Sequence, residues 1–99
     1  MVAIRQQDDA LWLTLSDLDL DDGQGLEALC SQLPTSCRRV IFDLGAIERL
    51  QATGLGRLLT LRRQLLARGC TDFTIARPSA QINELSQLLG LRRVFAMAA

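Results

Sequence analysis

The sequence predicts one α/β domain in which a mixed sheet of about four strands packs against three to four helices, in the order β-β-α-β-α-β-α. Three observations support this class. Apolar residues alternate with period two near the N-terminus, a continuous apolar run lies mid-chain, and leucines recur at helical spacing after it. The length of 99 residues indicates a single domain over residues 1–99, with 48% apolar residues to fill its core.

The first two predicted strands form a hairpin. Apolar and polar residues alternate over residues 2–5 and again over residues 11–16, which indicates two half-buried strands. The polar sequence Gln7-Asp8-Asp9 between them is typical of a turn.

An amphipathic helix is expected next. Asp21 and Asp22 offer N-cap oxygens, and apolar residues then recur at i, i+3, i+4 and i+7 from Leu26 until a proline ends the pattern. Cys30 lies on this apolar stripe and is interpreted as a core residue. The carboxylates that start at Asp17 are interpreted as helix caps, because the Gly and Glu spacing of an EF-hand calcium loop is missing.

The middle of the chain predicts a central strand and the longest helix. The apolar run Val40-Ile41-Phe42 favours a strand that is buried on both faces. The helix is expected from Thr53 to Arg68, with Gly69 at its end and with Arg62 needing a partner between two apolar ridges. The ridges consist of Leu58, Leu61 and Leu65 and of Leu55, Leu59 and Leu66.

The C-terminal third predicts a fourth strand over Asp72 to Ala76 and a third helix that opens at Pro78-Ser79 and closes at Gly90. The tail from Leu91 to Phe95 is expected to pack back onto the sheet, and residues 96–99 are expected to be frayed. The apolar residues of this third helix are Ile82, Leu85, Leu88 and Leu89.

The composition argues against several classes of function. Eleven arginines balance eleven acidic residues, so no net field attracts nucleic acid or anionic lipid. No apolar run approaches the roughly 20 residues that cross a bilayer, and we expect a cytoplasmic protein without direct membrane insertion. The three cysteines lack CxxC spacing and no histidine is present, which argues against a metal site; Cys37 and Cys70 lie near turns and stay unassigned.

Catalysis is not expected, and neither is a cofactor. The chain has no histidine or tyrosine, and its spacing offers no nucleophile and base pair and no phosphate-binding loop. Asp43 follows the central strand, where α/β sheets often place functional groups. We interpret Asp43 as an acceptor that orders the following loop.

Several short motifs occur in a characteristic order. They are Leu18-Asp19, Val40-Ile41-Phe42-Asp43-Leu44, Gly54-Leu55-Gly56, Leu58-Leu59, Leu61-Arg62-Arg63, Ala67-Arg68-Gly69, Leu88-Leu89-Gly90-Leu91 and Val94-Phe95. Taken together they resemble the STAS family, which includes anti-sigma-factor antagonists and a domain of sulfate transporters. The resemblance implies a non-catalytic protein-interaction module for signal transduction and transcription regulation by partner switching, with an anti-sigma factor, a serine-kinase-like protein or a regulatory complex as partner.

The resemblance also identifies a phosphorylation loop. Family members commonly read Asp-Ser-Ser-Gly or Asp-Thr-Gly-Gly there, and the first hydroxyl accepts phosphate from a partner kinase. This chain reads Gln51-Ala52-Thr53-Gly54, so that Ala52 occupies the phosphoacceptor position and cannot carry phosphate. Thr53 is either the N-cap of the long helix or an alternative phosphoacceptor.

The partner surface implied by the resemblance covers the loop and the start of the long helix. Gly54 and Gly56 are interpreted as positions of close approach or of a turn, or as places where a partner's backbone comes near. Arg57, Gln64 and Arg68 are assigned to the solvent side of the helix, either merely solvated or docking a partner. The predicted partner-binding residues are Gln51, Ala52, Thr53, Gly54, Leu55, Gly56 and Arg57.

A second function follows from the same resemblance. STAS-like domains also occur in transporters, so the chain could serve as a cytosolic adaptor or regulatory subunit of a membrane transporter of the ABC lipid-transport type. Its partner would then be the ATPase complex of that transporter.

Overall fold

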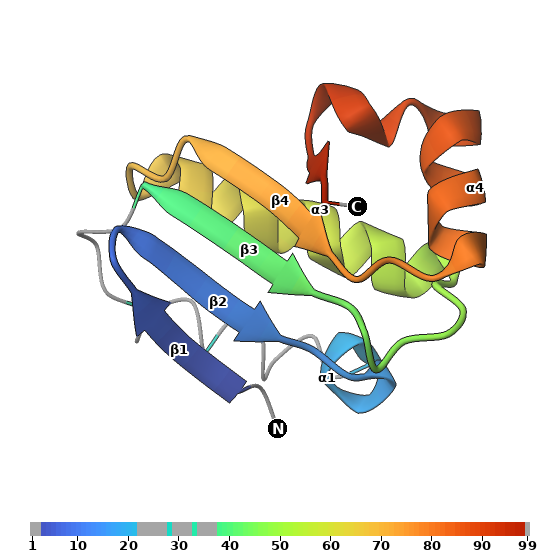
Figure 1. The fold of residues 1–99 in the computed structure, drawn as a ribbon, viewed down its shortest axis with the longest axis horizontal. Coiled ribbons are helices and arrows are strands. Elements are labelled where there is room, and N and C mark those ends of the chain that lie inside the picture. Colours follow the sequence, from blue (N-terminus) through green and yellow to red (C-terminus); the bar gives the residue numbers. More distant parts are fainter. Residues whose placement is uncertain (1–2, 22–27, 29–32, 34–37, 99) are drawn as a thin grey trace.

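The computed structural model describes residues 3–21, 28, 33 and 38–98, and it has the predicted α/β architecture (Figure 1). The strands are β1 (Ala3–Gln7), β2 (Ala10–Thr14), β3 (Arg39–Asp43), β4 (Asp72–Ala76) and β5 (Ala96–Met97). The helices are α1 (Asp17–Asp21), α3 (Ala52–Ala67), α4 (Ala80–Leu89) and the short 3-10 helix η1 (Leu91–Arg93).

The five strands form one mixed sheet in the order β1-β2-β3-β4-β5. The β1–β2 pair is antiparallel and all other pairs are parallel, so that the strand predicted to be central, β3, lies in the middle. The predicted sheet of about four strands has a fifth, short strand. The expectation of a frayed end was wrong at residues 96–98, because β5 pairs with β4 and the Ala98 N–H donates to the Ile75 carbonyl at 2.9 Å. The buried Phe95 ring, edge-on to Phe42, anchors this last strand.

The N-terminal hairpin is confirmed, with a turn at Asp8 and Asp9 in which Asp8 has a positive φ of 55°. In β2, Leu11 and Leu13 are fully buried while Trp12 and Thr14 are partly exposed, as the alternation predicted. The prediction of a half-buried first strand was wrong for β1, where every residue is exposed. The reason is that β1 lies at the edge of the sheet, where it has a neighbouring strand on one side only.

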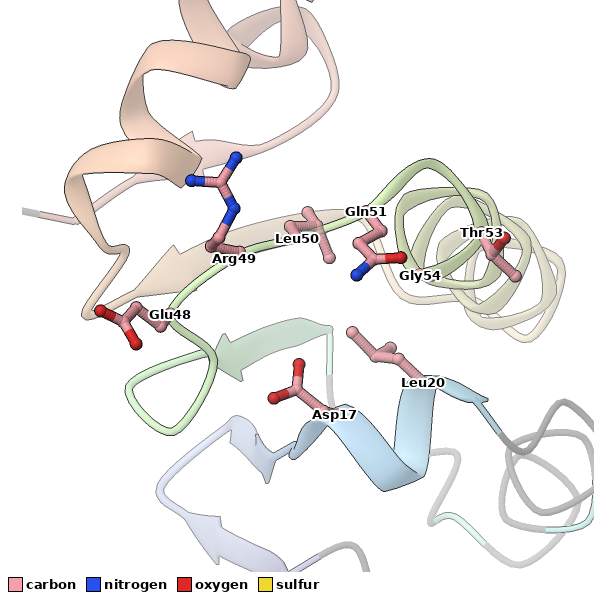
Figure 2. A pocket seen from close by; sticks show the side chains of 8 residues that line it. All are labelled: Asp17, Leu20, Glu48, Arg49, Leu50, Gln51, Thr53 and Gly54. Carbon is pink, nitrogen blue, oxygen red and sulfur yellow. The ribbon is translucent and has the colours of Figure 1, made fainter.

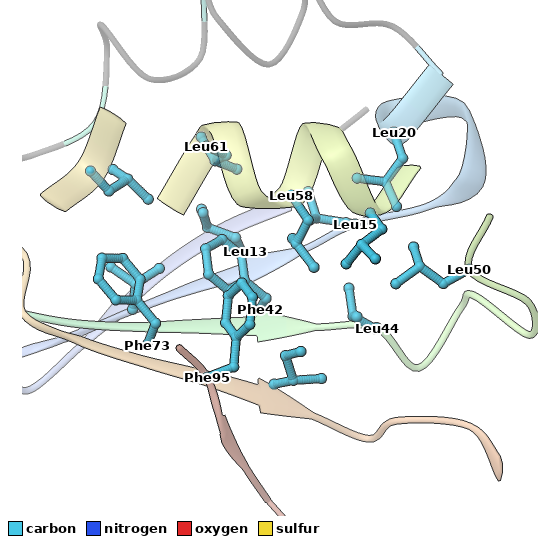
Figure 3. Close-up of a cluster of buried hydrophobic side chains, with 14 of the residues drawn as sticks. Leu13, Leu15, Leu20, Phe42, Leu44, Leu50, Leu58, Leu61, Phe73 and Phe95 are labelled. Carbon is cyan, nitrogen blue, oxygen red and sulfur yellow. The ribbon is translucent and has the colours of Figure 1, made fainter. Parts of the chain in front are cut away.

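The core lies between α3 and one face of the sheet (Figure 3). Leu58, Leu61 and Leu65 of α3 are buried against this face, as predicted for the first ridge. The second ridge is only partly buried, since Leu66 is 45% exposed. Arg62 meets the expected partners: its Nε donates to the Val94 carbonyl at 3.1 Å, and its guanidinium lies over the ring of Phe73.

Both faces of the central strand are buried, as predicted. Val40 and Phe42 point into the core, while Ile41 lies in a smaller cluster with Ala10 and Ala76 on the opposite face. Among the described helices, Figure 1 shows α3 along one face of the sheet only. Among the described residues, the neighbours that bury Ile41 on this face are Ala10, Ala76, Trp12 and Ala98.

Helix α4 has the predicted ends. The Ser79 hydroxyl caps it by accepting the Ile82 N–H at 3.2 Å, and Gly90 ends it in the left-handed conformation, with φ 65°. Only two of the four apolar residues of this helix pack against the core. Ile82 is buried and Leu85 packs at the core edge, while Leu88 and Leu89 are exposed.

The amphipathic helix predicted after Asp22 lies outside the described residues except for residues 28 and 33, and so do Cys30 and Cys37. The preceding acidic stretch forms the short helix α1, which was not predicted, and Asp19 takes part in capping this helix. The Asp19 carboxylate accepts from the Ser16 N–H at 2.8 Å and from its hydroxyl at 2.9 Å, while the Asp19 N–H faces the Ser16 hydroxyl at 3.4 Å. Cys70, left unassigned from the sequence, is buried in the core.

Candidate functional site

The predicted loop leaves the carboxyl end of the central strand, where Asp43 fixes its first residues. As expected from the sequence, the Asp43 carboxylate accepts the Gly45 N–H at 3.0 Å. It also accepts two hydrogen bonds of 2.8 Å from the Arg77 guanidinium. A Cβ at position 45 would lie 2.5 Å from the guanidinium carbon of Arg77, so a side chain there would require that arginine to shift. Burial alone would raise the pKa of Asp43, but the bonds from Arg77 and Gly45 and the charge of Arg77 outweigh it and lower the pKa.

The next part of the loop is held by the beginning of α4. The Gln81 amide bonds the backbone of Leu50 in both directions, accepting its N–H at 2.8 Å and donating to its carbonyl at 3.1 Å. The Ser79 hydroxyl donates to the Glu48 carbonyl at 2.7 Å. Sequence reasoning missed both contacts, because each joins residues 31 positions apart that no local pattern connects.

The chain enters α3 through Gln51, which corrects one prediction. Gln51 is the N-cap residue, with extended backbone and no side-chain capping bond, and the helix begins at Ala52. Thr53 was predicted to be the N-cap and is instead the second residue of the helix. The physical reason is that the tethered Leu50 holds the preceding backbone extended, so the helix can begin directly after Gln51. Gln51, Ala52 and Thr53 are exposed to solvent.

The two glycines of the loop region differ. Gly54 is buried, and a Cβ there would lie 3.2 Å from Leu50 and 3.4 Å from Leu20, so the predicted close approach is confirmed. Gly56 is exposed in ordinary helical geometry, and a Cβ there would meet nothing within 4 Å. Within the described part of the chain, the interpretation of Gly56 as a close-approach or turn position was therefore wrong.

The other predicted residues of α3 are less exposed than expected. Leu55 belongs to the core. Arg57, Gln64 and Arg68, which were assigned to the solvent side, are each half-buried, and Arg68 donates to the Leu33 carbonyl at 2.7 Å. The Nε of Arg57 is buried without a hydrogen-bond partner among the described residues.

A pocket of about 430 Å³ opens beside the start of α3 (Figure 2). Leu20 of α1 and Leu50 of the loop form apolar walls, and the Gln51 amide and the Asp17 carboxylate point toward the space between them. Asp17 and Leu20 were missed from the sequence, because they come from a helix some thirty residues earlier. The lining residues are Asp17, Leu20, Glu48, Arg49, Leu50, Gln51, Thr53 and Gly54.

The described residues include no group of three potential ligands that could hold a metal ion. In the same part of the chain, no helix has the length and apolar character needed to span a membrane.

Comparison with solved structures shows a shared fold. A variant of RsbS from Moorella thermoacetica superposes with a TM-score of 0.77 at 19% identity, covering 96% of this chain and 85% of that one. An anti-sigma factor antagonist from Mycobacterium paratuberculosis gives a TM-score of 0.71 at 20% identity, covering 98% and 83%. The anti-sigma factor antagonist SpoIIAA in its unphosphorylated form gives 0.66 at 17% identity, covering 100% and 89%.

At these identities the structures establish the fold, while the sequence itself establishes the family. A search of curated protein sequences finds no match. The family model described as "STAS domain", in contrast, matches residues 2–99, nearly the whole chain. The chain therefore belongs to the STAS domain family.

Proposed function

We propose that this chain is a non-catalytic, cytoplasmic protein-interaction module of the partner-switching type. Its docking surface is the exposed turn Gln51-Ala52-Thr53 together with the start of α3 as far as Arg57. The observation that carries this proposal is a solvent-facing turn whose two flanks are rigidly held, by Gln81 on one side and by the buried Gly54 on the other. A turn that keeps its shape before docking loses little conformational entropy on binding.

The second part of the proposal concerns the missing switch. The start of α3 has the features that favour a phosphate: exposed first-turn residues, no side-chain cap and the positive end of the helix dipole. Ala52 has no oxygen to carry the phosphate, so the usual phosphorylation of the family cannot release the partner. The exposed hydroxyl of Thr53 is the alternative acceptor at this turn.

Affinity capture from native cells with quantitative mass spectrometry tests the docking surface. Ala52→Glu places a carboxylate on the turn, where the helix dipole favours it, so we expect unchanged folding and loss of the partner. Ala67→Glu, an equally charged change at the exposed far end of the same helix, is the matched control and should retain the partner. Equal capture by all three proteins would refute the surface. Recovery of a transporter ATPase subunit, rather than an anti-sigma factor or kinase, would assign the chain to the adaptor class.

A gain-of-function variant tests the switch. When a captured kinase partner and ATP are added, Thr53 is the one residue of the native chain on which phosphate is expected. Thr53→Ala should abolish any phosphorylation that the native chain shows. Ala52→Ser restores a hydroxyl at the exposed turn and should be phosphorylated and release the partner. Phosphate on a third residue of the native chain, or an Ala52→Ser protein that is phosphorylated yet stays bound, would contradict the proposal.

A further inference from the structure

The C-terminal end of α4 exposes an apolar surface that the fold does not use. Leu88 is 76% exposed and Leu89 is 56% exposed, so together they present more surface than one fully exposed leucine. Arg92 and Arg93 of η1 are exposed directly beyond them. We call these four residues the Leu–Arg patch. A single exposed leucine is ordinary, whereas adjacent exposed leucines rimmed by charge are typical of interaction surfaces.

The local fold explains why these side chains face outward. Leu88 lies on the side of α4 away from the buried Ile82 and Ser86. Leu89 follows Ser86 by three residues and so shares its side of the helix, but it stands in the last turn. The left-handed Gly90 then redirects the chain and buries Leu91, while Leu89 stays 56% exposed. In Figure 1, α4 stands at the periphery beyond β4, with its last turn leading into η1.

The two arginines have no ion-pair partner within the part of the chain that the structure describes. Their position after a helix C-terminus is favourable in itself, because the dipole is negative there. The Nε of Arg93 lies 3.9 Å from the point where a Cβ of Gly90 would be, which places its side chain beside the helix end. The helix dipole therefore favours the two arginines at this position. It does not compensate for the exposure of the two leucines, which only an apolar partner surface would bury.

We propose that the Leu–Arg patch binds an acidic amphipathic segment of a partner protein, whose apolar side chains cover Leu88 and Leu89 and whose carboxylates pair with Arg92 and Arg93. Charge complementarity selects this occupant. A membrane fits less well, because two leucines and two arginines on a chain with balanced charges give too little insertion and too little attraction for stable anchoring. The patch begins at the opposite end of α4 from Gln81, so the proposal is independent of docking at the Gln51 turn.

The test uses the intact chain and a fluorescent helical peptide with leucines at i, i+3 and i+7 flanked by glutamates. We expect saturable binding that weakens with salt and is absent for a peptide with lysines in place of the glutamates. Leu88→Asn should weaken binding roughly tenfold, since it removes a buried leucine from the contact. Replacing both arginines by glutamine should abolish the salt dependence.

The controls remove the same kinds of side chain elsewhere. Leu66→Asn and Arg63→Gln alter exposed positions of α3 and should bind the peptide like the native chain. The proposal is overturned if the peptide fails to bind, if both peptides bind equally, or if Leu88→Asn binds as the native chain does. It is also overturned if the patch instead holds the chain on phosphatidylglycerol vesicles, or mediates a dimer that Leu88→Asn dissociates in analytical ultracentrifugation.

Discussion

Replacing Gly56 by alanine should stabilise the folded protein. Gly56 is the fifth residue of the 16-residue helix α3, is exposed, has ordinary helical geometry and leaves open space where a methyl group would go. A glycine in a helix interior is about 0.8–1.0 kcal/mol less favourable than alanine. The added methyl meets nothing that could offset this gain, so we expect the free energy of unfolding to rise by about 1 kcal/mol.

Urea denaturation followed by circular dichroism measures the change. For a domain of this size, a gain of about 1 kcal/mol raises the Tm by roughly 4–8 °C and moves the urea midpoint without altering the slope. Gly54→Ala is the matched control on the same helix, because its methyl would press on Leu50 at 3.2 Å and on Leu20 at 3.4 Å. We expect Gly54→Ala to be at least about 1 kcal/mol less stable than Gly56→Ala. Equal effects at both positions would refute the assignment of one glycine to close packing and the other to open solvent.

Three further predictions concern the residues that hold the site. Thr53→Ala should change the free energy of unfolding by less than about 0.5 kcal/mol, whereas Ser79→Ala, which removes a true cap, should cost about 1 kcal/mol. Gln81→Ala should cost about 1–3 kcal/mol and speed amide exchange in the tethered loop, because it leaves a buried backbone N–H and carbonyl unpaired. The lowered pKa of Asp43 stabilises the folded protein, and this contribution is fully present above about pH 4, the usual carboxyl pKa. It is lost as the pH falls toward the pKa that Asp43 has in the folded protein, and Arg77→Gln should make the loss of stability with falling pH smaller.

Each of these predictions has a contrary outcome. Equal losses in Thr53→Ala and Ser79→Ala would show that the threonine caps α3 after all. The exposed Gln87→Ala is the control for Gln81→Ala, and matching exchange rates in the two variants would argue against the tether. For the ion pair, the native chain and Arg77→Gln are compared by urea denaturation from pH 7 down to pH 2. If the difference in the free energy of unfolding between these two proteins stays constant over that range, the contribution of Arg77 does not depend on the ionised Asp43 carboxylate.

Periodicity in the sequence was enough to locate most elements. The bounds of β4 were predicted to the residue, and α4 opens after Pro78-Ser79 and ends at Gly90, as expected. These features are local, since a cap or an alternating strand is determined by neighbours a few residues away. The final strand β5 was missed because two residues carry no periodicity, and its pairing depends on the burial of Phe95.

The site was predicted less well than the fold, and the reason is distance along the chain. The resemblance to the family was what singled out the candidate loop, and its role stays a prediction. The tether from Gln81 to Leu50 and the packing of Leu20 against Gly54 each join residues about thirty apart, which only the folded chain brings together. Exposure along α3 was also misjudged, because Arg57 and Arg68 were placed by residue type on a side that is half-buried.

The strand order has a consequence for how the protein is made. Since the spatial order of the sheet equals the order of synthesis, every strand finds its neighbour already present as it leaves the ribosome. No strand has to be inserted between two strands that were synthesised before it. Phe95 follows the first four strands in the sequence and completes the aromatic contact with Phe42 in the centre of the sheet. We therefore expect a chain truncated before Phe95 to be compact but loosely packed.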